Sequence, residues 1–133
     1  MLPTPIKVRS DWALLFLRVS GSLLLLAVHG LPKLTNMQAE LGSIEDPLGL
    51  GPVITLALAL FAEVVCPLLI IFGPFTRLAS LPILAVLLVS LALVHPQWSL
   101  AEGQFAWLLA IVFTTLAIGG PGRFALGRHL PFQ

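Results

Sequence analysis

The chain has 133 residues, of which 58% are hydrophobic and only 10% are charged. The hydrophobic share is above that of a typical soluble domain, and together with a mean hydropathy of +1.03 it excludes a water-soluble protein and predicts an integral membrane protein. The formal net charge of +1 gives no reason to expect a nucleic-acid partner.

Four apolar runs are candidates for membrane-spanning helices, which need about 20 residues each to cross the hydrocarbon. The runs are continuously apolar and rich in Leu, whereas barrel strands alternate in polarity over about 10 residues. We therefore predict an all-α fold, an integral membrane four-helix bundle that forms one domain over residues 1–133. The predicted helices cover residues 12–30, 52–72, 77–94 and 100–119, and the last of these needs its flanks to reach the required length.

The first predicted helix follows Ser10 and Asp11, which we expect to cap its N-terminus just before the interfacial Trp12. Arg18 interrupts the apolar run, so we interpret this segment as a retained helix rather than a cleavable signal peptide. The offset from Arg18 to His29 is about three whole turns at 100° per residue. Both side chains are therefore expected on one face of the helix.

The long connection over residues 31–51 has a helical pattern of its own. Leu34, Met37 and Leu41 recur at helical spacing and are separated by polar residues. This pattern is typical of a short amphipathic helix that lies on the outer membrane surface. A lid over the mouth of the bundle is the alternative interpretation.

The second predicted helix carries Glu63 near the middle of its apolar run. A carboxylate in hydrocarbon is costly unless it is protonated, paired or exposed to a polar cavity, so Glu63 indicates a functional site. Pro67 cannot donate to the Glu63 carbonyl, which predicts a kink or a free carbonyl there, although proline is also common in membrane helices. Cys66 is the only cysteine, and we interpret it as a small buried hydrophobe.

Basic residues fall on one side of the predicted bundle. The loops on that side contain Lys7, Arg9, Arg77, Arg123 and Arg128. The loops on the other side contain only Lys33 among Lys and Arg. By the positive-inside rule, both termini are predicted to be cytoplasmic.

The first candidate site is an inner pair, Arg18 with Glu63. Counted from the same membrane face, their depths differ by about the reach of one Arg side chain, so contact between them is feasible. The pair would be either a buried salt bridge that fixes two helices or a polar pocket that holds a quinone head group or relays a proton.

The second candidate site is an outer group of His29, Lys33, His95 and Glu102, which the predicted topology brings to one membrane face. These side chains suit a quinone carbonyl, a metal ion or an anionic substrate, but polar residues also belong at any membrane interface. The two histidines form no diagnostic haem motif, and the possible metal ligands are far apart in sequence. We therefore predict no metal site.

The order of these features along the chain resembles the DoxX family. The residues that carry the resemblance are Arg18, His29-Gly30-x-x-Lys33, Glu63, Gly73-x-x-x-Arg77 and Gly120-Pro121-Gly122. Family members often continue with Ser-Leu-Asp after the last turn, whereas this chain reads Arg123-Phe124-Ala125-Leu126-Gly127. The family supplies no assigned catalytic residue to transfer.

The resemblance implies a multi-pass protein of a bacterial-type inner (plasma) membrane that is associated with redox processes. Some relatives are small subunits of a thiosulfate-oxidising, quinone-reducing complex, and others join assemblies that couple superoxide handling to thiols. We therefore expect an accessory subunit of a membrane oxidoreductase that contacts lipid and a redox partner in a homo- or hetero-oligomer. Quinone is the expected ligand, with no intrinsic cofactor. The alternative is a non-enzymatic scaffold, or a small proton or solute carrier that works as an oligomer.

Overall fold

A computed structural model describes residues 4–127, and within that range the regular structure is entirely helical. Three stretches are long and apolar enough to cross a membrane, namely Pro5–Thr35, Pro52–Phe72 and Thr76–Val94. The fourth apolar helix, α7 (Gln104–Gly119), has 16 residues and is therefore about 24 Å long at 1.5 Å per residue. The prediction of a helical membrane protein is confirmed.

The first membrane helix begins earlier than expected. Helix α1 (Pro5–Leu25) is capped by Thr4, whose side chain accepts a hydrogen bond from the Lys7 amide at 3.2 Å. Pro5 occupies the first helical position, where its missing N–H costs nothing. The prediction that Ser10 and Asp11 cap this helix is therefore wrong.

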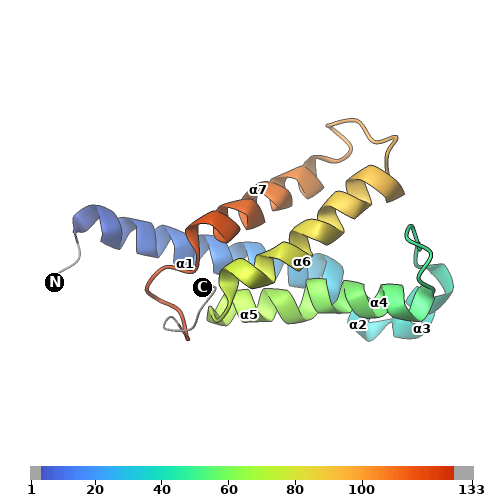
Figure 1. The fold of residues 1–133 in the computed structure, drawn as a ribbon, viewed down its shortest axis with the longest axis horizontal. Coiled ribbons are helices and arrows are strands. Elements are labelled where there is room, and N and C mark those ends of the chain that lie inside the picture. Colours follow the sequence, from blue (N-terminus) through green and yellow to red (C-terminus); the bar gives the residue numbers. More distant parts are fainter. Residues whose placement is uncertain (1–3, 128–133) are drawn as a thin grey trace.

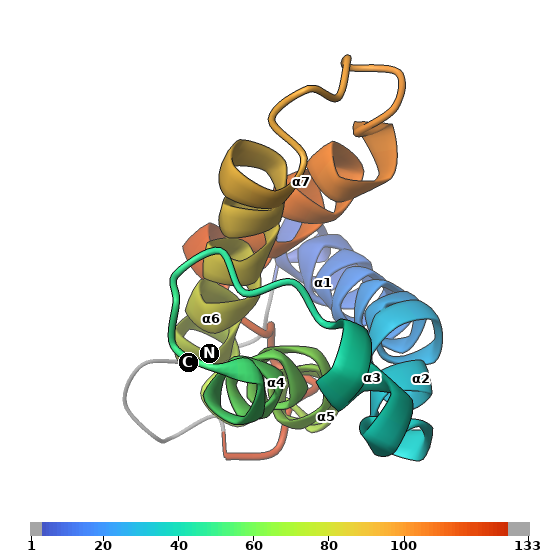
Figure 2. The same ribbon diagram turned by 90° about the vertical axis from the view of Figure 1, so that its right-hand side faces the viewer.

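Beyond α1 the same helical rod continues through a π-helix, η1 (Leu26–Gly30), into α2 (Leu31–Thr35). A turn at Asn36 then leads to α3 (Met37–Ser43). Both short helices lie at the end of the molecule where α4 begins (Figures 1 and 2). The amphipathic segment expected outside the membrane is thus divided between an extension of the first membrane helix and the separate helix α3.

The second membrane helix contains another π-helix. It consists of α4 (Pro52–Leu60), η2 (Phe61–Val65) and α5 (Cys66–Phe72). It ends at Gly73, whose φ of 112° is in the left-handed region that glycine adopts without strain. The sequence predicts a kink or a free carbonyl near Pro67, and in the structure the π-helix η2 ends two residues before this proline.

The last two helices form an antiparallel pair. Helix α6 (Thr76–Val89) continues through η3 (Ser90–Val94), and α7 returns along it (Figure 1). Helix α1 packs against both α5 and α7, so four helical rods surround a common core.

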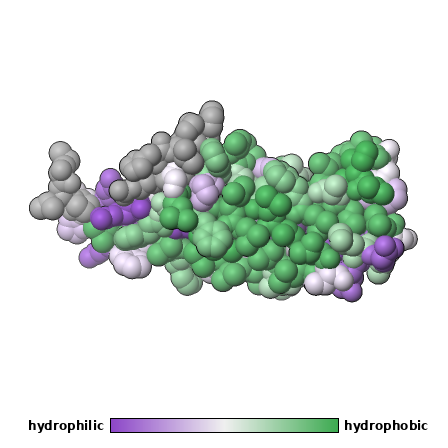
Figure 3. Space-filling view, turned by 90° about the horizontal axis from the view of Figure 1, so that it is seen from below, coloured by the Kyte–Doolittle hydropathy of each residue, from purple (hydrophilic) through white to green (hydrophobic). Residues whose placement is uncertain are grey.

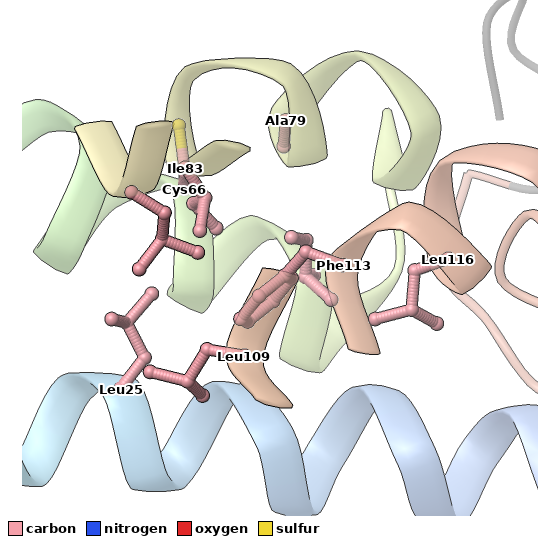
Figure 4. Packing of buried hydrophobic residues seen from close by; sticks show 9 residues of the cluster. Leu25, Cys66, Ala79, Ile83, Leu109, Phe113 and Leu116 are labelled. Atoms are coloured by element: carbon pink, nitrogen blue, oxygen red, sulfur yellow. The ribbon is translucent and has the colours of Figure 1, made fainter. Parts of the chain in front are cut away.

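The core is small and apolar. Leu25 from α1, Cys66 from α5, Ile83 from α6 and Phe113 from α7 are all at most 2% exposed and meet at its centre (Figure 4). The face shown in Figure 3 is hydrophobic along its middle and hydrophilic toward both ends. A hydrophobic belt of this kind is what the hydrocarbon of a bilayer requires.

Candidate functional site

The π-helices η1 and η2 contact each other and have the same backbone hydrogen-bond pattern. In η2 the Cys66 amide donates to the Phe61 carbonyl, five residues earlier. The next residue is Pro67, which has no N–H, so the Ala62 carbonyl keeps no amide donor from its own helix. In η1 the same arrangement ends at Pro32. Both rods are therefore irregular at the level where they meet, and π-helical turns of this kind are frequent at functional sites.

The two backbones touch where η1 crosses η2. A Cβ atom placed on Gly30 would lie only 2.1 Å from the carbonyl oxygen of Glu63. No residue other than glycine fits at this position without moving the helices apart. The crossing brings the C-terminal end of the first rod's η1 segment and the start of α2 directly beside Glu63.

An ion pair forms at this crossing. The Lys33 Nζ atom lies 2.9 Å from Glu63 Oε2, and it also approaches the His29 carbonyl oxygen at 3.5 Å. The side chains of Glu63 and Lys33 are only 9% and 21% exposed. Within residues 4–127 no well-directed hydrogen bond reaches Oε2, so the ammonium group is the compensating charge for this carboxylate.

The predicted pair of Arg18 and Glu63 is wrong. Arg18 is 1% exposed, and its guanidinium donates instead to the backbone carbonyls of Ile70, Ile71, Pro121 and Phe124. The distances to Ile70 and Pro121 are both 3.1 Å. The last carbonyls of α5 have no amide donors within the helix, and a guanidinium supplies several donors at once. These acceptors lie two turns beyond Glu63, about 10 Å along the helix.

A second charged residue, Asp11, is buried, although the sequence predicted it to be a helix cap. Asp11 is 5% exposed, and its Oδ1 accepts a hydrogen bond from the Arg123 amide at 3.1 Å. Because Asp11 precedes Arg18 by about two helical turns, both side chains emerge from one face of α1. Together they hold residues 120–127, which we call the C-terminal arm, against the middle of α1 and the end of α5. The two-turn spacing of Asp11 and Arg18 is the feature of the sequence that could have indicated that they share one face of the helix.

His95 and Glu102 do not join the Lys33–Glu63 pair. His95 stacks on Trp98 with ring centroids 3.8 Å apart, and Glu102 accepts a hydrogen bond from the Ser99 hydroxyl at 3.2 Å. Both views show the turn between η3 and α7 well away from α2 (Figures 1 and 2). The predicted outer group is therefore divided, with His29 and Lys33 near Glu63 and the other two residues elsewhere.

The remaining sequence candidates are simpler. In the part of the chain that the structure describes, no three His, Cys, Asp or Glu side chains come close enough together to hold a metal ion. Cys66 is fully buried among core hydrophobes. The chemistry that the site offers is therefore that of one ammonium donor and one carboxylate acceptor, with the half-buried His29 beside them.

These features define a multi-pass helical membrane protein with an ion pair inside one of its helix crossings. The model of the DoxX family matches residues 13–96, more than half of the chain. The protein therefore belongs to the DoxX family, and the matched range includes Arg18, His29, Lys33 and Glu63. A search of curated proteins and a search of solved structures each found no match.

Proposed function

We propose that this protein is an accessory subunit of a membrane oxidoreductase and that Lys33, Glu63 and His29 bind the head group of a membrane quinone. The observation that supports this proposal is the Lys33–Glu63 pair, which lies where two irregular apolar helices cross. Ionisable groups inside a membrane protein are costly and usually mark a site where a ligand, ion or proton is handled.

The chemistry of a quinone suits this arrangement. A quinone carbonyl accepts hydrogen bonds, and the Lys33 ammonium is a donor. The reduced form carries hydroxyl groups, and the Glu63 carboxylate is an acceptor for them. Exposed apolar residues of the first rod, such as Val28 and Leu31, provide a surface for the tail. The partner protein supplies or removes the electrons in this proposal.

We further propose that α7 completes four membrane crossings and that both termini are cytoplasmic, in a bacterial-type inner membrane. Helix α7 runs antiparallel to α6 and packs along it and α1, so it occupies the same layer as helices that are long enough to span. The exposed residues Lys7, Arg9, Arg77 and Arg123 lie toward one end of the bundle. The positive-inside rule assigns that end to the cytoplasm, which places Lys33 toward the outside.

The proposal is tested by measuring binding of a short-chain quinone to the protein in nanodiscs by calorimetry. We expect Lys33→Met and Glu63→Gln each to weaken binding about tenfold, because each removes one charge-assisted hydrogen bond. Glu45→Gln is the control, since Glu45 is exposed and lies in the loop before α4. Unchanged affinity in both site variants, with helix content preserved, contradicts the proposal.

The same buried acid favours a second candidate, a proton carrier that works as an oligomer. A carboxylate that is 9% exposed inside an apolar helix is a candidate site where a proton is handled. Proton flux in proteoliposomes that is lost in Glu63→Gln, together with absent quinone binding in the wild type, would select this candidate.

A further inference from the structure

We propose that the basic end of the bundle contains a binding site for the phosphate group of an anionic phospholipid, formed by the Arg123 guanidinium on a platform of Phe124 and Trp12. This site is separate from the Lys33–Glu63 pair and does not depend on the function proposed above.

The platform consists of two aromatic rings and one cation. The Arg123 guanidinium lies 5.4 Å from the centre of the Phe124 ring. That ring packs against Trp12, with centroids 4.6 Å apart and planes tilted by 41°. Stacking on an aromatic ring orients a guanidinium, and its parallel N–H groups match two phosphate oxygens. Trp12 is 58% exposed, as expected of an indole at the head-group level of a bilayer.

The backbone that carries this platform is fixed at several points. Asp11 binds the Arg123 amide, and Arg18 binds the Phe124 carbonyl. Two residues farther on, the arm is joined to α5 by a hydrogen bond from the Leu126 amide to the Phe72 carbonyl at 2.9 Å. An ordered backbone reduces the entropy lost when Arg123 binds a ligand. Asp11 and Arg18, the two buried charged residues of α1, therefore fix the backbone that carries the exposed Arg123 side chain.

The charge of Arg123 remains available for a ligand. Among residues 4–127 no carboxylate lies within ion-pair distance of its guanidinium, and the nearby Asp11 is buried and accepts from the backbone. Three further basic residues, Lys7, Arg9 and Arg77, are exposed at the same end. Each basic residue near a membrane surface adds to the attraction for anionic lipid.

The surroundings favour a lipid phosphate over a free phosphate ion. Phe16 lies one turn beyond Trp12 on α1 and is 74% exposed, so apolar surface continues from the platform toward the hydrocarbon. A lipid bound through its phosphate would lay its acyl chains along this surface, whereas inorganic phosphate would gain nothing from it.

The test uses native mass spectrometry of the full chain in detergent, titrated with phosphatidylglycerol or phosphatidylcholine. We expect Arg123→Ala to weaken phosphatidylglycerol binding about tenfold and Arg123→Lys to weaken it less, with little change for phosphatidylcholine. Arg9→Ala is the matched control, because it removes the same charge from an exposed position at the same end.

Two results would overturn the inference. An equal loss in Arg9→Ala and Arg123→Ala would mean that general charge attraction, and no built site, explains the binding. Displacement of phosphatidylglycerol by an equal concentration of inorganic phosphate would mean that the acyl chains contribute nothing and that the ligand is a free anion. Because the Arg123 side chain is exposed and only its amide binds Asp11, the alanine variant is expected to keep the fold.

Discussion

The Lys33 Nζ atom lies 2.9 Å from Glu63 Oε2 where two membrane helices cross. Each of these helices contains a π-helix at the crossing. The charges are close because the backbones are close, with Gly30 in contact with the Glu63 carbonyl. The pair therefore depends on a glycine and two prolines as much as on its own side chains.

Removing the second charge of this pair should cost less than removing the first. We expect Glu63→Gln and Lys33→Met each to lower the free energy of unfolding by about 1–3 kcal/mol, since each leaves a mostly buried charge without its partner. The double variant should lose less than the sum of the two. Thermal unfolding in detergent measures all three, and additive losses would show that the two charges do not interact.

Gly30→Ala should disrupt the helix crossing. The added methyl group would overlap the Glu63 carbonyl, so we expect a loss of about 2–3 kcal/mol or failure to fold. Gly42→Ala in α3 is the matched control, because outside its chain neighbours and its own helical backbone no atom lies within 4 Å of the added Cβ. That change should be neutral or stabilise by up to about 1 kcal/mol. Equal stability of both variants in a melting experiment would contradict the close contact.

Arg18→Lys should destabilise the protein although it keeps the charge. One ammonium group cannot reach four carbonyls that are spread over α5 and the C-terminal arm. We expect a loss of about 2 kcal/mol or more, and faster proteolysis of the arm. Arg9→Lys, at an exposed position, should change neither quantity. Limited proteolysis followed by mass spectrometry locates the cleavage.

Asp46 makes the loop before α4 sensitive to acid. The Gly51 amide, and next the Thr55 hydroxyl, donate to its carboxylate and hold the pKa of Asp46 below its ordinary value of 3.8. A lowered folded-state pKa means that the stabilisation is complete above the ordinary pKa and is lost as pH falls through the lowered one.

We therefore expect the Gly51 amide resonance to keep its folded shift down to about pH 4 and to move only at lower pH. In Asp46→Asn, which cannot titrate, the same resonance should not show this transition. A wild-type transition near neutral pH would contradict the assignment. NMR titration of the two proteins makes the comparison.

The helices and the acidic residue of the ion pair, Glu63, were accessible to sequence reasoning for one physical reason. Apolar run length predicts a span, and a charge inside such a run is conspicuous without any knowledge of the fold. The predicted first helix began at Trp12 rather than at Pro5, because residues 5–11 are mostly polar and basic and form no continuous apolar run.

The choice of partners was not accessible in the same way. Depth along a helix made contact between Arg18 and Glu63 feasible, but depth does not specify the direction in which a side chain points. The unpaired carbonyls at the end of α5, which attract Arg18, exist only once the helix has a definite end. Likewise, topology placed His95 and Lys33 toward one membrane face without specifying the lateral distance between them.

The π-helix η1 also determines the direction, around the helix axis, in which the side chains of α2 point. Each residue of a regular helix turns the chain by about 100°, so deleting Val28 from η1 would rotate Lys33 by roughly that angle relative to α1. Lys33 and Glu63 would both remain in the chain and at nearly the same depth, yet the ammonium group would point away from the carboxylate. The Lys33–Glu63 pairing thus depends partly on the number of residues in η1. A comparison of residue types alone does not detect this dependence.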